Sequence, residues 1–258
     1  MWAWVRLAIV GGVVAGAMVA GQQQAGRAGA VAGSVAAMAF VSWLGLLLPR
    51  AAHHHFRAGN VRAAGRRYRL LRAVTIDPER RGAIDVSLAA CSLAGDDIIG
   101  ARTTLARVDR KRVGEATRSA LLNNLAYASL CSGGDGYAAL ALADEAIALR
   151  PHVAGFHHTR AAALLALNRL DEAIRILDDL WRDIAGDDDS AILEAERCYD
   201  LGRAWQRKGH TDYARDYFER ARRAAPTSSW SVRATAELPP PQAISASAAT
   251  VAAGPSPE

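Results

Sequence analysis

The chain has 258 residues, of which 51% are hydrophobic, with a formal net charge of +5 and an isoelectric point of about 9.4. This length suits one or two ordinary domains. Arginine carries the positive charge, because Lys111 and Lys208 are the only lysines. No basic run is interleaved with aromatic residues, so a surface for single-stranded nucleic acid is disfavoured and nucleic acid is not an expected partner.

The first 48 residues hold only two charges, Arg6 and Arg27. Residues 1–21 and 28–48 are apolar, and each is close to the roughly 20 residues that a transmembrane helix needs. Residues 22–27 form a short polar link between them. We therefore expect two antiparallel transmembrane helices that form a hairpin.

Both apolar segments are rich in small residues. Gly12 with Gly16, and Gly29 with Gly33, have the four-residue spacing that lets helix backbones approach closely. This spacing predicts a tightly packed hairpin or a dimer face.

An alternative interpretation makes residues 1–20 a cleaved signal peptide, with a charged start that ends at Arg6 and an apolar stretch from Leu7 to Val19. The second apolar segment would then stop transfer. Both interpretations leave the rest of the chain on the same side of the membrane.

Arginine is abundant directly after the second segment. The link between the segments offers only Arg27, and positive residues remain on the cytoplasmic side. The sequence thus predicts an inner (cytoplasmic) membrane protein of a bacterium with its C-terminal part in the cytoplasm. The arginines after the second segment are Arg50, Arg57, Arg62, Arg66, Arg67, Arg69 and Arg72.

From about residue 56 to 226, apolar residues recur at helical spacing and in a repeating pattern. The clearest unit, Ala195 to Pro226, contains Leu201, Gly202, Trp205, Gly209, Ala214, Phe218, Ala221 and Pro226. This unit resembles the tetratricopeptide repeat (TPR) family, which has small, aromatic, glycine and proline residues at these spacings. Small residues let two antiparallel helices approach, while the glycine turns the chain and the proline ends the second helix.

Upstream segments follow the same pattern. Ala139 and Ala173 are one 34-residue repeat apart, and an Asp-rich insertion at 186–190 precedes the last unit. Two weaker units cover 85–108 and 57–78. The resemblance implies an all-α, TPR-like helix-turn-helix solenoid over residues 49–226, with three clear and one or two degenerate repeats. Residues 227–258, rich in Pro, Ser and Ala, are predicted to be a disordered tail.

The resemblance implies a protein- or peptide-binding scaffold with a concave groove lined by the first helix of each repeat. Such a scaffold would assist assembly of a membrane-associated complex. The lysines that some TPR proteins use to grip a terminal carboxylate are missing, but Arg203 and Arg207 would suit an acidic segment. The groove residues implied by the resemblance are Asn123, Asn124, Tyr127, His158, Tyr199, Arg203, Gln206 and Arg207.

Arg62, Arg66 and Arg69 follow one helical side close to the second apolar segment. They form a candidate membrane surface for anionic headgroups. This leaves two alternatives to the scaffold: an accessory subunit of a membrane enzyme, and a charge-driven binder of anionic lipid or nucleic acid.

No catalytic or phosphate-binding motif is visible, so we expect neither an enzyme nor a cofactor. His53–His55 and Asp187–Asp189 lack the spacing of metal ligands, and no metal site is predicted. Cys91, Cys131 and Cys198 are far apart and lie in helical patterns, which predicts free thiols.

Overall fold

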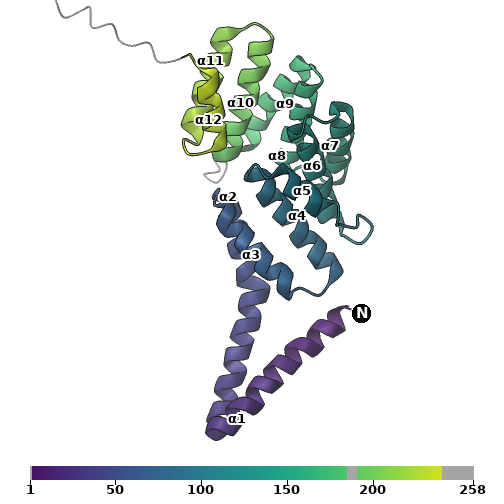
Figure 1. Cartoon of the computed structure of the whole chain (residues 1–258), viewed down its shortest axis with the longest axis vertical. Coiled ribbons are helices and arrows are strands. Elements are labelled where there is room, and N and C mark those ends of the chain that lie inside the picture. Colours follow the sequence, from purple (N-terminus) through teal and green to yellow (C-terminus); the bar gives the residue numbers. More distant parts are fainter. Residues whose placement is uncertain (1, 185–190, 240–258) are drawn as a thin grey trace, which may run out of the picture. The chain divides into compact units, whose positions relative to one another are not determined.

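The computed structural model describes residues 2–184 and 191–239, which divide into two compact units, residues 1–190 and 191–258 (Figure 1). The described residues contain helices and no strand, which confirms the all-α prediction. The Asp-rich insertion and most of the predicted tail lie outside the described residues. The helices of the first unit are α1 (Trp2–Ser42), η1 (Trp43–Leu47), α2 (Leu48–Arg57), α3 (Val61–Val74), α4 (Pro78–Ala94), α5 (Ile98–Leu105), α6 (Glu115–Cys131), α7 (Gly136–Leu149), α8 (Ala154–Ala166) and α9 (Leu170–Ile184). The second unit contains α10 (Ala191–Arg207), α11 (Thr211–Ala224) and α12 (Ser229–Glu237).

Helix α1 is folded back on itself. Ala25 and Gly26 have non-helical backbone angles, with φ of +62° at Gly26, so the chain reverses there (Figure 1). The break occupies two residues, whereas the sequence predicts a six-residue link at 22–27. Residues 2–24 and 27–42 therefore form two arms of a helical hairpin.

Small residues bring the two arms into backbone contact near the reversal. A Cβ atom added at Gly29 would overlap the carbonyl oxygen of Gly21, and one at Gly33 would overlap that of Ala17. Gly12 and Gly16, in contrast, have open space around them. The predicted close packing therefore holds for the second glycine pair and not for the first.

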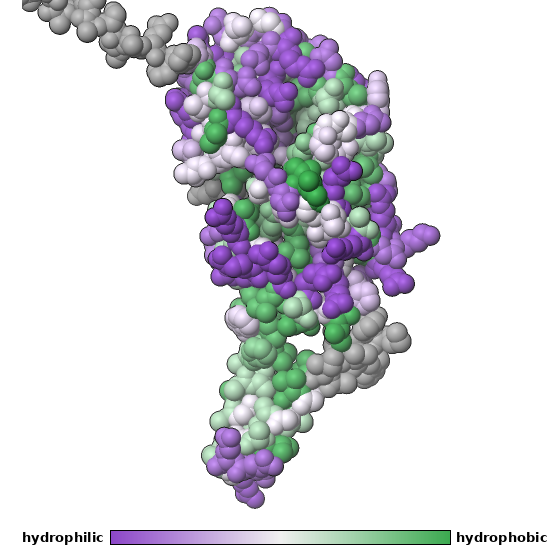
Figure 2. Space-filling view, in the orientation of Figure 1, coloured by the Kyte–Doolittle hydropathy of each residue, from purple (hydrophilic) through white to green (hydrophobic). Residues whose placement is uncertain are grey.

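The second arm continues without interruption into the repeat region. A single turn of π-helix, η1, joins the arm to α2. The helical residues 10–57, which the reversal at Ala25 and Gly26 divides, contain an apolar window long enough to cross a membrane by length and composition. Figure 2 shows a largely hydrophobic surface along the lower part of the hairpin, where Val31, Val35 and Met38 are more than half exposed, and a polar tip.

Five antiparallel helix pairs follow: α2–α3, α4–α5, α6–α7 and α8–α9 in the first unit, and α10–α11 in the second. Each pair has one small buried residue on each helix, where the two backbones approach. The two residues are twelve positions apart in four pairs and thirteen in α6–α7, where the turn between the helices is one residue longer. The five pairs of small residues are Ala52 and Ala64, Ala89 and Ala101, Ala126 and Ala139, Ala161 and Ala173, and Gly202 and Ala214.

The turn of every helix pair contains one residue in the left-handed region, which ends the first helix. The next helix starts two or three residues later, and in three pairs an Asn or Asp side chain accepts a hydrogen bond from its first turn. The structure thus has the TPR-like hairpin five times. The left-handed residues are Gly59, Asp96, Gly133, Asn168 and Gly209.

The first pair corrects the predicted domain boundary. The sequence predicts a membrane helix at 28–48 and the repeats from 49, but Leu44, in η1, and Leu48 pack with Tyr68 and Leu71 of α3. The end of the apolar segment is therefore also the first helix of the first repeat.

Helix α12 corrects the predicted tail, which was expected to be disordered from residue 227. Ser228 caps this helix by accepting a hydrogen bond from the Ser231 amide, 3.2 Å away. Trp230 and Ala234 pack onto the core of α10 and α11. One aromatic residue among Ser, Thr and Arg gives too weak a periodic signal to reveal a nine-residue helix.

Candidate functional site: repeat surfaces and an apolar pocket

The residues implied by the TPR resemblance fall in both units, and each group is described within its own unit. On α6, Asn124 donates a hydrogen bond to the Val86 carbonyl of α4, 3.2 Å away, so its amide joins two first helices of neighbouring pairs. Asn123 is half-buried, and its side-chain oxygen is buried with no hydrogen-bond partner among the described residues. Tyr127 is half-buried against the core of α4, α5 and α6.

His158 on α8 is 2% exposed. A side chain this deeply buried would have to leave the core before it met a partner. His158 is therefore a core residue of its helix pair, although the resemblance places it in the groove.

Tyr199 on α10 is also buried, since its ring packs 5.5 Å from that of Trp230 on α12 and 5.8 Å from that of Phe218 on α11. Helix α12, which the sequence pattern does not predict, covers this position. Gln206 of α10 donates a hydrogen bond to the carboxylate of Glu237 on α12, 3.2 Å away. Of the four α10 residues, Arg203 and Arg207 are exposed and Gln206 is exposed but engaged with α12.

The three arginines assigned to a membrane surface are exposed on α3, and that assignment stays a prediction. The pKa of His55 is lowered, first by desolvation and then by the nearby positive charges of Arg67, His54 and Arg66. His55 is near the end of α2, two helical turns beyond the apolar segment. Arg62 and Arg66 lie in the first two turns of α3, next to the α2–α3 turn.

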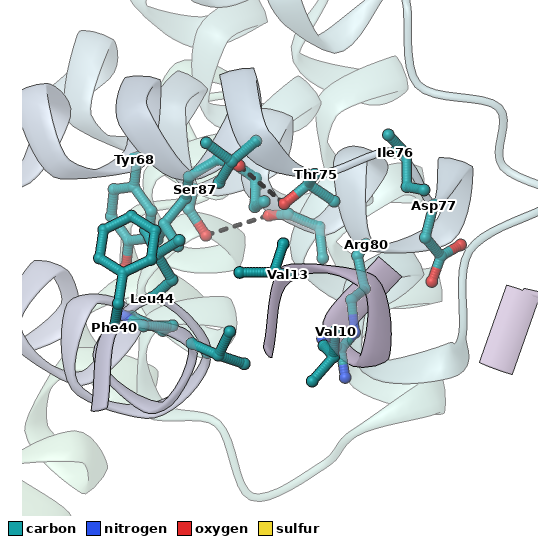
Figure 3. Close-up of a pocket in the computed structure, with 17 residues that line it drawn as sticks. Val10, Val13, Phe40, Leu44, Tyr68, Thr75, Ile76, Asp77, Arg80 and Ser87 are labelled. Atoms are coloured by element: carbon teal, nitrogen blue, oxygen red, sulfur yellow. Dashed lines mark hydrogen bonds between the residues drawn. The ribbon is translucent and has the colours of Figure 1, made fainter. Parts of the chain in front are cut away.

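Residues of α3, α4 and the connection between them share a pocket with the apolar hairpin. There an apolar pocket of about 730 Å³ opens between the two arms of α1, η1 and the α3–α4 connection (Figure 3). This volume is within the roughly 300–1,000 Å³ of typical small-molecule sites. Apolar side chains from all three sources line it, among them Val10, Val13, Phe40, Leu44, Leu71 and Ile84.

The hydroxyl groups in the pocket wall already donate hydrogen bonds to backbone carbonyls of the protein. Thr75 donates to the Leu71 carbonyl at 2.7 Å and Ser87 to the Ala83 carbonyl at 3.1 Å, as Figure 3 shows. Burial raises the pKa of the Tyr68 phenol, which also has a side-chain hydrogen bond with Ser87. The interior of the pocket therefore presents an apolar surface.

Two charged residues at the start of α4 lie at the other side of the pocket from Phe40 and Tyr68 (Figure 3). Asp77 caps α4, because its carboxylate accepts a hydrogen bond from the Glu79 amide at 3.1 Å. Arg80 is exposed and forms no ion pair with any described residue. The next residue, Arg81, donates to the Thr75 carbonyl at 2.5 Å. The pocket thus combines an apolar interior with a cation at its edge.

The wall of this pocket is held together by ionic and apolar contacts. Arg72 of α3 forms an ion pair with Asp85 of α4, whose side chain is 9% exposed. Removing one partner of such a pair leaves a charge in a desolvated position, so the pair disfavours separation of the two helices.

Cysteine and histidine residues do not assemble into a reactive or metal-binding group in the described part of the chain. Cys91 and Cys198 are buried, which raises their pKa values to about 11 and about 12, whereas Cys131 is exposed. The predicted Asp187–Asp189 cluster lies outside the described residues.

No protein-family model matches the chain, and none of the curated proteins matches it. Among solved structures, a thermophilic TPR protein of Thermus thermophilus is 21% identical with a TM-score of 0.48, over 74% of this chain and 96% of that one. A Podosopora anserina protein proposed to be a kinesin light chain, with nearly identical TPR-like repeats, is 22% identical with a TM-score of 0.43, over 70% and 94% of the two chains. A single-substitution form of the same protein gives 21% and 0.44.

Proposed function

We propose that this chain is a membrane-anchored, TPR-like scaffold that binds a protein partner and assists assembly of a membrane-associated complex. The observation that carries the proposal is the unbroken helix from the second arm of α1 through η1 into α2. The apolar hairpin is therefore built into the first repeat. An anchor of this kind would fix the repeats rigidly at the bilayer surface.

The dimensions of the second arm support insertion. Residues 28–43, which precede the part that packs on α3, span about 24 Å at 1.5 Å per residue, most of the roughly 30 Å hydrocarbon core of a bilayer. The arms meet at a polar tip that includes three glutamines and Arg27. This tip would lie at the far headgroup layer, with the repeats on the arginine-rich cytoplasmic side of an inner membrane.

Arg203 and Arg207 of α10 are the exposed cations that we assign to partner binding in the second unit. An acidic peptide segment fits the arginines, since guanidinium groups form bidentate bonds with carboxylates.

Membrane insertion is tested by extraction of native membranes with alkaline carbonate and with high salt, followed by detection of the full chain. Retention in the pellet under both conditions is expected. A reporter fused after Glu258 that is active only in the cytoplasm would support the orientation. Recovery of the chain in the soluble fraction would overturn the anchor.

Partner binding is tested by crosslinking in native membranes, with the wild-type chain compared with the Arg203→Ala, Arg207→Ala double variant. We expect that variant to lose its crosslinked partner. The matched control is Arg215→Ala, Arg222→Ala, which removes two exposed cations from α11. Equal loss in both variants would indicate a non-specific charge effect and contradict the assigned surface.

A further inference from the structure

The apolar pocket beside α1 has the composition of a site for an amphiphile. Its interior is formed by hydrocarbon side chains, and the hydroxyl groups of Thr75 and Ser87 are already bonded within their own helices. Water inside such a cavity would face few polar partners. An alkyl chain would replace that water with apolar contacts, which is favourable.

The edge of the pocket supplies a complementary charge. Arg80 lines the pocket and has no ion pair among the described residues. Asp77, the acidic residue at the same edge, accepts the Glu79 amide as the cap of α4. A guanidinium that is free of a carboxylate can bind a phosphate through two parallel hydrogen bonds.

We propose that this pocket binds one acidic glycerophospholipid, with an acyl chain between the arms of α1 and the phosphate at Arg80. The proposal rests on the membrane insertion proposed above, because the two arms of α1, which line one part of the pocket, would then lie in the bilayer that supplies the ligand. Val74 and Ile76, at the connection of α3 and α4, are 49% and 41% exposed and would meet the headgroup layer. The bound lipid would join the anchor to the first two repeats.

The test uses the full chain in a non-ionic detergent with added phosphatidylglycerol or phosphatidylcholine of identical acyl chains. Native mass spectrometry counts the lipids that remain bound to each chain. We expect one phosphatidylglycerol per chain and roughly tenfold weaker retention of phosphatidylcholine. Either phosphate can accept a charge-assisted hydrogen bond from Arg80. Only the phosphate of the acidic lipid keeps its negative charge uncompensated, because the choline ammonium offsets it in phosphatidylcholine.

Two variants separate the headgroup from the chain. Arg80→Gln should weaken phosphatidylglycerol retention roughly tenfold and remove the preference between the two lipids. Gly45→Phe should abolish retention of both lipids, since Gly45 lines the pocket and has open space where its Cβ would lie. Arg66→Gln, which removes an exposed arginine outside the pocket, should behave like the wild type.

Circular dichroism and thermal melting check that each variant folds. If Gly45→Phe does not fold, Ala83→Phe on the opposite wall provides the same test, because Ala83 also lines the pocket. Full lipid retention by a folded pocket-filling variant, or by Arg80→Gln, would overturn the proposal.

Other occupants give different results. Glycerol phosphate that binds as tightly as the lipid would show an anion site that does not hold an acyl chain. Equal retention of both lipids would show non-specific lipid association only. A co-purified polypeptide that occupies the pocket and excludes lipid would show a protein helix instead. Each of these results contradicts the lipid proposal. Carbonate extraction separates the two hypotheses: a chain that stays in the membrane but retains no lipid loses only the pocket assignment.

Discussion

Gly202 and Phe218 are in such close contact that no larger side chain fits at the glycine. A Cβ atom at Gly202 would lie 2.6 Å from both Cδ1 and Cε1 of the Phe218 ring. Gly202 is inside helix α10, where glycine is unfavourable by roughly 0.5–1 kcal/mol relative to alanine. The ring therefore explains the glycine: α10 and α11 can approach only if one helix has no side chain at the contact.

We expect Ala214→Leu to destabilise the α10–α11 pair by about 1–3 kcal/mol, because Ala214 is 3% exposed and overpacking forces the helices apart. Gly202→Val should have the same effect through Phe218. Hydrogen exchange should increase in α10 and α11 and remain unchanged in α6. The control is Ala236→Leu at an exposed position of α12. Unchanged protection in both core variants would mean that the repeat register is wrong.

Two glycines without steric neighbours should respond in opposite directions to alanine. Gly209 has φ of +82° at the α10–α11 turn, so Gly209→Ala should cost about 1–2 kcal/mol although its Cβ would meet open space. Gly155 has ordinary helical angles and open space, so Gly155→Ala should stabilise the protein by about 0.5 kcal/mol. Urea unfolding of the two variants measures both changes. The same sign in both would show that backbone conformation is not the cause.

The last helix pair could be predicted from the sequence because its signal is local. Gly202, Gly209, Ala214 and Phe218 each occupy a position where the backbone or a neighbouring helix permits only that kind of residue. The first pair can be predicted only in part. Ala52 and Ala64 have the same spacing, but the residues before them belong to a uniformly apolar run. In such a run, hydropathy cannot distinguish a lipid-facing side chain from one that packs on α3.

The candidate site is less predictable because it depends on contacts between elements that the repeat pattern does not describe. Tyr199 lies at a position that faces the groove in a TPR, but α12 covers it. The sequence pattern does not predict that helix. The apolar pocket depends on where residues far apart in sequence meet, such as Val10 and Arg80. A repeat pattern describes contacts within and between repeats and contains no information on how the apolar hairpin packs against them.

Thiol labelling should distinguish the exposed cysteine from the two buried ones. Cys131 is exposed, while Cys91 and Cys198 are buried and their pKa values are raised to about 11 and about 12. Because the thiolate is the reactive form, the native protein should label rapidly at Cys131 alone near pH 8. Denaturant should make all three thiols reactive. Rapid native labelling of Cys198 would show that the α10–α11 core opens readily.

The raised thiol pKa values also predict loss of stability at alkaline pH. The folded-state pKa of Cys198 is about 12, above its ordinary value of 9.0, so the unfolded chain loses this proton first as the pH rises. Its contribution is fully present below about pH 9 and is lost as the pH rises toward 12. Cys198→Ala should be less stable at pH 8, where it leaves a small cavity, but should show a flatter dependence of the unfolding free energy above pH 9. An unchanged slope would exclude this thiol as the cause.

The boundaries of the repeat region can be tested with two fragments. A fragment of residues 57–226, as the sequence pattern suggests, lacks α2 and α12. It would remove Leu48 and Ala52 from Tyr68 and Leu71, and Trp230 from Tyr199. A fragment of residues 48–239 keeps all of these contacts.

We expect the longer fragment to be protected from hydrogen exchange in α3 and α10, and the shorter one to exchange rapidly in both while α6 stays protected. The reason is that repeat arrays are stabilised mainly by contacts between neighbouring elements, so loss of a terminal helix exposes the helix beneath it. The substitution Trp230→Ala in the longer fragment isolates the α12 contact, and should loosen α10 without affecting α3. Equal protection in both fragments would mean that α2 and α12 contribute little, and the repeat region would then end where the sequence pattern alone places it.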